Sequence, residues 1–165
     1  MTAPDERLGQ VTEVPDGVQV RFRRSWPDPI GDVWAALTEP DRTARWFGRY
    51  EGERRVGGAG TLTMTHEEGA VGEPMRIVEC EPPRRLVVQW ESEQAWLIEL
   101  DLTEEQDRTV LVFTQVFPAG TDAGDYVLGW HWYLDHLDAE VSGGPAPAGW
   151  DDFLAATGPA YGSSS

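Results

Sequence analysis

The segment from Asp28 to Phe47 reads as two short helices placed back to back, and it restricts the possible folds more than any other segment. Its first half carries apolar residues at i, i+3, i+4 and i+7, the spacing of one helical stripe: Ile30, Val33, Trp34 and Leu37. Asp28 is a good helix cap, and Pro40 can end the first helix and begin the second. We expect helices over about 29–38 and 40–47. Because strand-like sequence flanks both helices, we expect a fold built around an internal cavity.

The sequence around the two helices alternates between apolar and polar residues, as strands with one buried face do. Such runs, or runs of β-branched residues, occur at 18–23, 50–53, 61–65, 75–81, 84–90, 95–103 and 109–117. Short turns join most successive runs after the helices, which predicts an antiparallel meander. A polar loop is expected over 66–72. We therefore expect an α+β fold with a curved antiparallel sheet of about six or seven strands.

A long amphipathic helix is predicted after the last strand, where the apolar period changes from 2 to 3.6. One band of its helical wheel is apolar: Tyr126, Trp130, Tyr133, Leu134, Leu137 and Val141. Thr121 or Asp122 can cap the start, and Gly143-Gly144 can end the helix. The apolar band must be buried on the sheet. Because its aromatic side chains are bulky, we expect them to leave a hollow between helix and sheet.

The chain is expected to divide into a leader, one domain and a tail. Residues 1–16 are polar and contain two prolines, which predicts a flexible leader. The domain is expected over 17–142. A linker and a short tail are expected over 143–165, with one or two helical turns beginning at Trp150.

A second stripe is predicted on the outer side of the long helix: Leu128, Trp132 and His136. The tail contains three aromatic residues: Trp150, Phe153 and Tyr161. Because an exposed tryptophan on the helix needs cover, we expect the tail to fold back on this stripe, or a second chain to cover it.

The charge of the chain excludes one large class of partners. The formal net charge is −16, and all 13 basic residues are arginine. Such a surface repels nucleic-acid backbones and anionic membranes, so neither nucleic-acid binding nor membrane insertion is expected. Cys80 is the only cysteine, which excludes an intramolecular disulfide. No apolar signal segment or membrane span is visible, and we expect a cytoplasmic protein.

Seven segments in a fixed order resemble a known family. They are Arg21–Arg24, Pro29 with Val33–Pro40, Arg45–Phe47, Val56–Gly58, Glu79–Leu86, Trp90 and Gly129–Leu137. Together they span most of residues 18–141. The chain resembles the SRPBCC (START-like) superfamily and, more closely, the bacterial homologues of the activator of the heat-shock protein 90 ATPase.

The resemblance implies a helix-grip fold, in which a curved antiparallel sheet wraps a long C-terminal helix and encloses a cavity. It also implies binding of lipids, sterols, polyketides or other apolar molecules. Some members of the superfamily are cyclases or aromatases, and the eukaryotic namesakes stimulate a chaperone ATPase in the stress response. Where many relatives carry histidine near the end of the last strand, this chain has Gln115, which removes a titratable group.

Candidate ligand-binding residues lie on the predicted inner faces of the strands and the long helix. They are Met75, Ile77, Trp90, Trp96, Ile98, Phe113, Gln115, Trp130, Tyr133 and Leu137. Tight core packing is the alternative role for the aromatic members of this set. In a helix-grip fold they would instead line the cavity, with Gln115 and Tyr133 as polar groups that orient a ligand hydroxyl or carbonyl.

The candidate catalytic residues are Glu79 and Tyr133. If Met75 and Ile77 face inward, strand alternation carries Glu79 inward too, where a carboxylate needs a partner or a raised pKa. The alternative is a position at the rim, or a salt bridge with the Arg84-Arg85 region. A catalytic role requires that Glu79 or Tyr133 face the cavity within reach of a partner.

Other reactive residue types are expected to be structural. His131 and His136 are about 140° apart on a helix, so they cannot share a metal ion, and no metal site is expected. His131 and Asp135 are expected to form a solvated pair. Cys80 lies between two glutamates, which disfavour its thiolate. Gly57–Gly60 leads into a strand rather than a helix and is expected to be a turn.

Three functions remain open from the sequence. The first is binding of a hydrophobic or aromatic small molecule without a metal or cofactor, by a monomer or weak homodimer. The second is an enzyme of the cyclase, aromatase or dehydratase kind, also without metal. The third is a protein-interaction domain similar to the chaperone activators. A continuous cavity of several hundred cubic ångströms favours the first two, and a packed interior with an exposed apolar patch favours the third.

Overall fold

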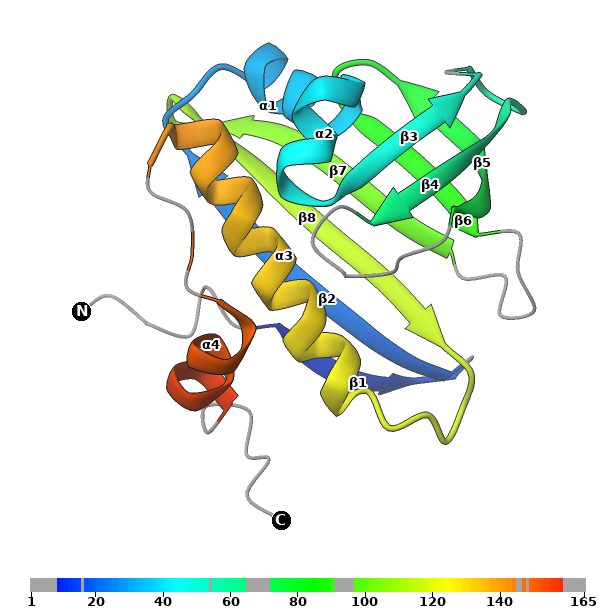
Figure 1. Cartoon of the computed structure of the whole chain (residues 1–165), viewed down its shortest axis with the longest axis vertical. Helices are drawn as coiled ribbons and strands as arrows, with labels where there is room; N and C mark the ends of the chain where they lie inside the picture. Colours follow the sequence, from blue (N-terminus) through cyan, green and yellow to red (C-terminus); the bar gives the residue numbers. More distant parts are fainter. Residues whose placement is uncertain are drawn as a thin grey trace.

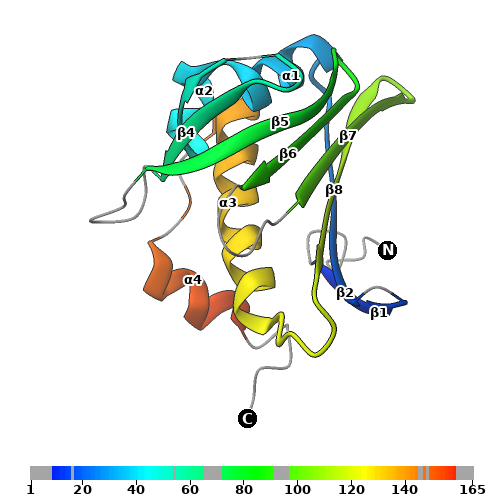
Figure 2. The same cartoon turned by 90° about the vertical axis from the view of Figure 1, so that its right-hand side faces the viewer.

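The computed structural model describes residues 9–15, 17–53, 55–64, 72–90, 97–144, 147 and 149–158. Within these ranges the element order is β1 (Gln10–Val14), β2 (Gly17–Trp26), α1 (Ile30–Thr38), α2 (Pro40–Trp46), β3 (Gly48–Gly52), β4 (Ala59–Met64), β5 (Glu73–Glu81), β6 (Arg85–Trp90), β7 (Leu97–Glu105), β8 (Arg108–Phe117), α3 (Gly124–Ser142) and α4 (Trp150–Thr157). The sheet curves around α3, and α1 and α2 lie at one end of it (Figures 1 and 2). The α+β helix-grip architecture is confirmed. The polar loop predicted over 66–72 lies almost entirely outside the described residues.

The strands form one antiparallel sheet in the order β1-β2-β8-β7-β6-β5-β4-β3, with eight strands in the described part of the chain. The sequence predicted all of them except β1, which occupies residues that we expected to be a flexible leader. That expectation is wrong for residues 10–14, which pair with β2 from Gln10↔Arg21 to Val14↔Gly17. Because the side chains of β1 are mostly exposed, its backbone hydrogen bonds to β2, rather than a buried face, hold it in place.

The helix boundaries lie close to the predicted ones, although two caps differ. Pro29, and not Asp28, is the N-cap of α1, and the carbonyl oxygen of Asp28 instead accepts a hydrogen bond from the Thr109 hydroxyl (2.7 Å). Ala123 is the N-cap of α3, while the Asp122 carboxylate accepts from the backbone of Gly124 (3.0 Å). Gly143 ends α3 in the left-handed conformation, with φ 74°, as the sequence predicted.

The C-terminal helix α4 packs against the outer side of α3, as expected from the outer stripe (Figure 2). The Trp132 and Trp150 rings meet edge to face with centroids 5.3 Å apart. Phe153 stacks on Trp150 and also contacts the ring of His131 at 5.3 Å. Trp150 thus lies on Trp132, while Phe153 contacts Trp150 and His131, and Tyr161 lies outside the described residues.

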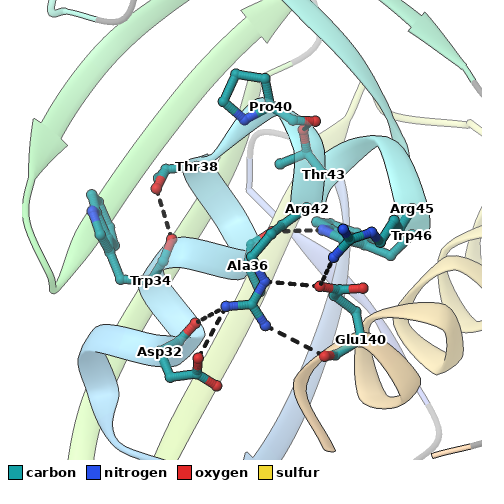
Figure 3. Close-up of polar contacts among 10 residues, drawn as sticks. All are labelled: Asp32, Trp34, Ala36, Thr38, Pro40, Arg42, Thr43, Arg45, Trp46 and Glu140. Carbon is teal, nitrogen blue, oxygen red and sulfur yellow. Dashed lines mark hydrogen bonds and ion pairs between the residues drawn. The ribbon is translucent and has the colours of Figure 1, made fainter. Parts of the chain in front are cut away.

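Two arginines fix α3 from different sides through charged hydrogen bonds. Arg24 on β2 is buried and donates to Asp135 (3.1 Å) and to Asp138 (2.8 Å) of α3. Arg42 on α2 donates to Glu140 (2.8 Å) of α3 (Figure 3). Charge-assisted hydrogen bonds of this kind are stronger than neutral ones. These hydrogen bonds therefore fix α3 relative to β2 and α2.

None of the helices in the described ranges combines the length and the apolar character needed to cross a bilayer.

Candidate ligand-binding cavity

A cavity of about 450 Å³ lies between the inner face of the sheet and the helices α1, α2 and α3. Among the described residues its wall comes from every strand from β3 to β8, from α1 and α2, and from Trp130 alone on α3. Strands β1 and β2 contribute nothing to that part of the wall. The cavity therefore lies under the part of the sheet formed by β3–β8, away from β1 and β2.

Six of the ten residues proposed from the sequence line this cavity: Met75, Ile77, Trp90, Ile98, Phe113 and Trp130. Three others are buried but do not line it: Gln115, Tyr133 and Leu137. Trp96 lies outside the described residues. The predicted inner faces of β5, β6 and β7 thus converge on one space, while part of the long helix is packed behind its wall.

Sequence reasoning missed the part of the wall that α1 and α2 provide. These helices and the residue after them contribute Trp34, Leu37, Thr38, Thr43, Trp46 and Phe47. The two helices lie at one end of the sheet (Figure 1) and also cover the cavity. The apolar stripe that predicts α1 contains two of these residues, Trp34 and Leu37. The stripe therefore predicted the helix, but not that these side chains line a cavity.

Further lining residues come from the strands and from one turn: Tyr50, Leu62, Cys80, Pro82, Leu86, Val88 and Leu100. Leu86 and Val88 belong to the alternating face that predicts β6, together with Trp90. The inward position of Cys80 was not predicted, and it follows from an irregularity in β5.

Phe47 is the centre of an aromatic cluster in the wall. Its ring stacks on Trp46 at 5.3 Å and on Trp130 at 5.2 Å, and it meets Trp90 edge to face at 6.2 Å. The Trp46 indole also donates a hydrogen bond to the carbonyl of Ala36 (2.7 Å), shown in Figure 3. These contacts hold the aromatic side chains in fixed orientations, so the wall is formed before any ligand enters.

The described wall carries no Asp, Glu, Arg or His side chain. Its two threonine hydroxyls donate to nearby backbone carbonyls, Thr38 to Trp34 (2.8 Å) and Thr43 to Pro40 (3.2 Å), as Figure 3 shows. The Tyr50 hydroxyl donates to the carbonyl of Glu53, and burial, aided by the Glu53 charge, raises the pKa of that phenol. The described lining is therefore neutral and mostly apolar.

Glu79 does not face the cavity, which corrects the inward position that strand alternation suggested. A β-bulge between Ile77 and Glu79 shifts the alternation of β5 by one residue. Cys80 consequently faces the cavity, and Glu79 lies on the outer face, where Arg85 donates to it at 3.1 Å. The alternative of a salt bridge with the Arg84-Arg85 region is the one that the structure contains.

Arg85 forms hydrogen bonds with three carboxylates on that outer face. Its guanidinium donates to Glu79, to Glu99 (2.8 Å) and to Asp101 (2.8 Å). These hydrogen bonds, the one to Glu79 most of all, raise the pKa of the Arg85 guanidinium. The cluster links β5, β6 and β7 on the side of the sheet opposite the cavity. Its charged side chains therefore cannot contact a ligand bound in the cavity.

Tyr133 lies behind the wall rather than in it. Its ring meets Phe47 edge to face at 5.2 Å and Trp130 at 6.2 Å, and both of these residues line the cavity. Tyr133 is 8 % exposed, so a ligand in the cavity would meet Phe47 and Trp130 first. The structure therefore gives this second catalytic candidate a supporting position.

The two described histidines have separate surroundings. His131 is buried against Phe22, and its Nε2 lies 3.5 Å from Asp135, so the expectation of a solvated pair is wrong. The Nδ1 atom of His136 lies 2.8 Å from the carbonyl oxygen of Trp132. In the parts of the chain that the structure describes, no three His, Cys, Asp or Glu side chains gather as a metal site would need.

Solved structures with the same architecture include two proteins of similar length. CalU16 from Micromonospora echinospora is 28% identical, with a TM-score of 0.71 and 93% of each chain covered. The protein encoded by gene BPP1335 from Bordetella parapertussis is 27% identical, with a TM-score of 0.74, and the match covers 100% of this chain and 96% of that one.

DynU16, a protein of the dynemicin biosynthetic locus, shares the fold at 24% identity and a TM-score of 0.68, over 79% of this chain and 49% of that one. No curated protein matches this chain. Residues 28–142 match the sequence pattern of the family described as "Activator of Hsp90 ATPase homolog 1-like protein", and this range contains α1, α2, β3–β8 and α3. The chain belongs to that family and has its SRPBCC-type helix-grip fold.

Proposed function

We propose that this protein binds a hydrophobic or aromatic small molecule in the cavity between the sheet and the helices α1–α3. The observation that carries the proposal is a cavity of about 450 Å³ with a neutral, mostly apolar lining that is rich in aromatic side chains. Its described wall contains seven aromatic side chains: Trp34, Trp46, Phe47, Tyr50, Trp90, Phe113 and Trp130. Cavities of roughly 300–1,000 Å³ with this character are typical of small-molecule sites.

Binding energy would come mainly from burial of apolar surface, at about 25 cal/mol for each square ångström removed from water. The fixed orientations of Trp46, Phe47 and Trp130 support this proposal, because a preformed wall lowers the entropy lost on binding. A planar aromatic ligand would also gain from stacking on these rings.

A catalytic role of the cyclase, aromatase or dehydratase kind receives less support. General acid–base chemistry needs a group that exchanges protons near neutral pH, and the described wall offers no carboxylate or imidazole. A role as a protein-interaction domain would favour a filled interior, which the cavity argues against. Binding is the function that requires nothing beyond the groups present in the wall.

The net charge and the cysteine content concern the partners of the protein and its cellular compartment. A net charge of −16 supports the absence of nucleic-acid partners, because it repels phosphate backbones. A single cysteine fits a reducing compartment such as the cytoplasm. We propose a cytoplasmic monomer or weak homodimer with one small-molecule site and no metal or cofactor.

The neutral dye N-phenyl-1-naphthylamine, which fluoresces strongly in apolar surroundings, tests the proposal. We expect saturable fluorescence enhancement with the wild-type protein and its loss in Leu86→Trp, which places an indole in the cavity. Val116→Trp adds the same group on the outer face of β8, where Val116 is 37% exposed, and should leave dye binding unchanged. Equal enhancement in all three proteins, or no binding to the wild type, would overturn the proposal.

The natural ligand can be sought directly. Native mass spectrometry of the protein purified from its own host should reveal a co-purified small molecule, and the Leu86→Trp variant purified in the same way should lack it. A mass shift that persists in Leu86→Trp would place the bound molecule elsewhere and contradict the proposed site.

A further inference from the structure

Gln115 on β8 is a buried polar residue whose side-chain amide is hydrogen-bonded at one end only, among the described residues. Its side chain is on the inner face, with 1% of the residue exposed. The Oε1 atom accepts a hydrogen bond from the Trp130 indole at 2.8 Å. Because an indole N–H can only donate, this bond fixes which end of the amide faces Trp130. The other end, Nε2, has no hydrogen-bond partner among the described residues.

An unsatisfied amide in this position is costly. A buried donor without a partner loses its hydrogen bonds to water and gains none in return, and the great majority of buried polar groups in native proteins are satisfied. Leucine would occupy a similar volume without that cost. A glutamine held here with Nε2 unpaired therefore points to a partner that the described part of the chain does not itself provide.

The surroundings of Gln115 connect it to the cavity. In the sheet it stands directly opposite Ile98, and Phe113 lies two residues away on the same face of β8. Ile98, Phe113 and the hydrogen-bonded Trp130 all line the cavity, so Gln115 is one side chain behind its wall. A ligand in the cavity would therefore be separated from the unpaired amide by one layer of side chains.

The chemistry of that atom follows from the groups around it. Nε2 can only donate, so its partner must be an acceptor. The described wall carries no cation that would compensate a buried carboxylate or phosphate, and burying an unpaired charge is strongly unfavourable. A neutral oxygen, such as a ketone or quinone carbonyl, meets both conditions.

We propose that Gln115 recognises a carbonyl oxygen on the ligand through Nε2, so that the cavity selects aromatic ketones or quinones over aromatic hydrocarbons of the same shape. This inference rests on the proposed function and narrows its ligand class. Gln115 acts as a specificity determinant, and Trp130 is the positioning residue that orients its amide.

A matched pair of probes tests the inference. Fluorene and 9-fluorenone have the same three-ring frame and differ by a methylene in place of the carbonyl. Displacement of N-phenyl-1-naphthylamine gives the affinity of each probe, and the measured quantity is the ratio of the two affinities in each variant. Because water solvates the two probes differently, the change in this ratio between variants, and not its absolute value, reports the hydrogen bond.

In Gln115→Leu we expect the preference for fluorenone to fall by about fivefold to tenfold, the value of one buried hydrogen bond, while fluorene still binds. Gln115→Leu leaves the Trp130 N–H without its acceptor, so the double variant Gln115→Leu/Trp130→Phe removes both groups and should show the same loss. Trp130→Phe alone keeps Gln115 and should retain most of the preference, although its affinity for both probes falls.

An unchanged ratio in both Gln115 variants would overturn the inference. A preference lost equally in Trp130→Phe would also overturn it, because the indole N–H would then be the donor. Failure of either probe to displace the dye, or failure of the dye to bind the wild type, is a different result, because it counts against the proposed function itself.

Discussion

The two halves of the sheet differ in how completely their inner-facing side chains are buried. Three inner-facing side chains that do not line the cavity are almost completely buried, with exposures of 0% for Val20 and 1% for Phe22 of β2 and 0% for Leu111 of β8. Inner-facing side chains of β4–β6 are more exposed, with 4% for Leu62 and 8% for Leu86, and both of these residues line the cavity. One half of the sheet is a packed core, and the other half is one wall of a hollow.

The comparison shows how a helix can be fixed beside an open space. Asp138 and Glu140 are about 200° apart around α3, so they reach opposite sides of the helix. Asp138 accepts from Arg24 on the sheet side, and Glu140 accepts from Arg42 on α2 (Figure 3). These ion pairs position α3 from both flanks, and close apolar packing against β4–β6 is not needed for its placement.

The largest expected effect comes from removing the buried arginine that anchors α3. Arg24→Met leaves Asp135 and Asp138 without their cation and should cost about 3–5 kcal/mol of the free energy of unfolding, measured in urea. Arg85→Met, on the outer face among more exposed carboxylates, is the control and should cost at most about 1 kcal/mol. A small loss in Arg24→Met would show that the ion pairs do not hold the helix.

The second prediction compares the same substitution in the two halves. Leu111→Ala removes a fully buried side chain from the packed half and should cost about 4 kcal/mol, whereas Leu86→Ala in the cavity wall should cost about 2 kcal/mol. The difference arises because Leu86 already lacks neighbours on its cavity side. Equal losses in urea unfolding would contradict the division of the sheet into packed and hollow halves.

The third prediction separates binding from stability. Phe47→Leu removes the central ring of the aromatic cluster and should weaken N-phenyl-1-naphthylamine binding by about threefold to tenfold, the value of an aromatic contact. Phe22→Leu makes the same change in the packed half and should lower the melting temperature without changing the affinity of the dye. Weaker dye binding in Phe22→Leu would mean that the packed half also contributes to the site.

The smallest expected effect concerns Tyr50 in the cavity wall. Burial, together with the Glu53 charge, raises the pKa of its phenol above the ordinary value of 10.0. The folded state therefore holds this proton more tightly than the unfolded state, and stability that is complete below pH 10 declines as the pH rises through the raised pKa. Tyr50→Phe should flatten the decline in unfolding free energy above pH 10, and an unchanged slope would argue against burial of the phenol.

Regular periodicity explains what could be predicted from the sequence. Local spacing sets three patterns: the stripe around Trp34, the alternation in β6 and β7, and the aromatic band of α3. The corresponding helices and strands therefore appear where they were expected. β1 has no such pattern, because exposed edge strands depend on backbone pairing with a neighbour. It could not be recognised from residues 10–14 alone.

The cavity wall was less predictable, because it depends on contacts between segments that are far apart in the sequence. The bulge that turns Glu79 outward and Cys80 inward leaves no mark in the alternation of apolar residues. The covering role of α1 and α2 follows from where they sit on the sheet. Whether an inner-facing residue lines the cavity or lies behind it, as Tyr133 does, is decided by its neighbours, here Phe47 and Trp130.

Methyl NMR during titration with N-phenyl-1-naphthylamine tests the hollow half against the packed half in one experiment. We expect the methyl signals of Ile77, Leu86 and Val88 to shift with a single saturating dissociation constant, while those of Val20 and Leu111 stay in place. Shifts spread equally over both sets, or absent from the cavity set at saturating dye, would contradict the claim that the open half of this sheet is a ligand site.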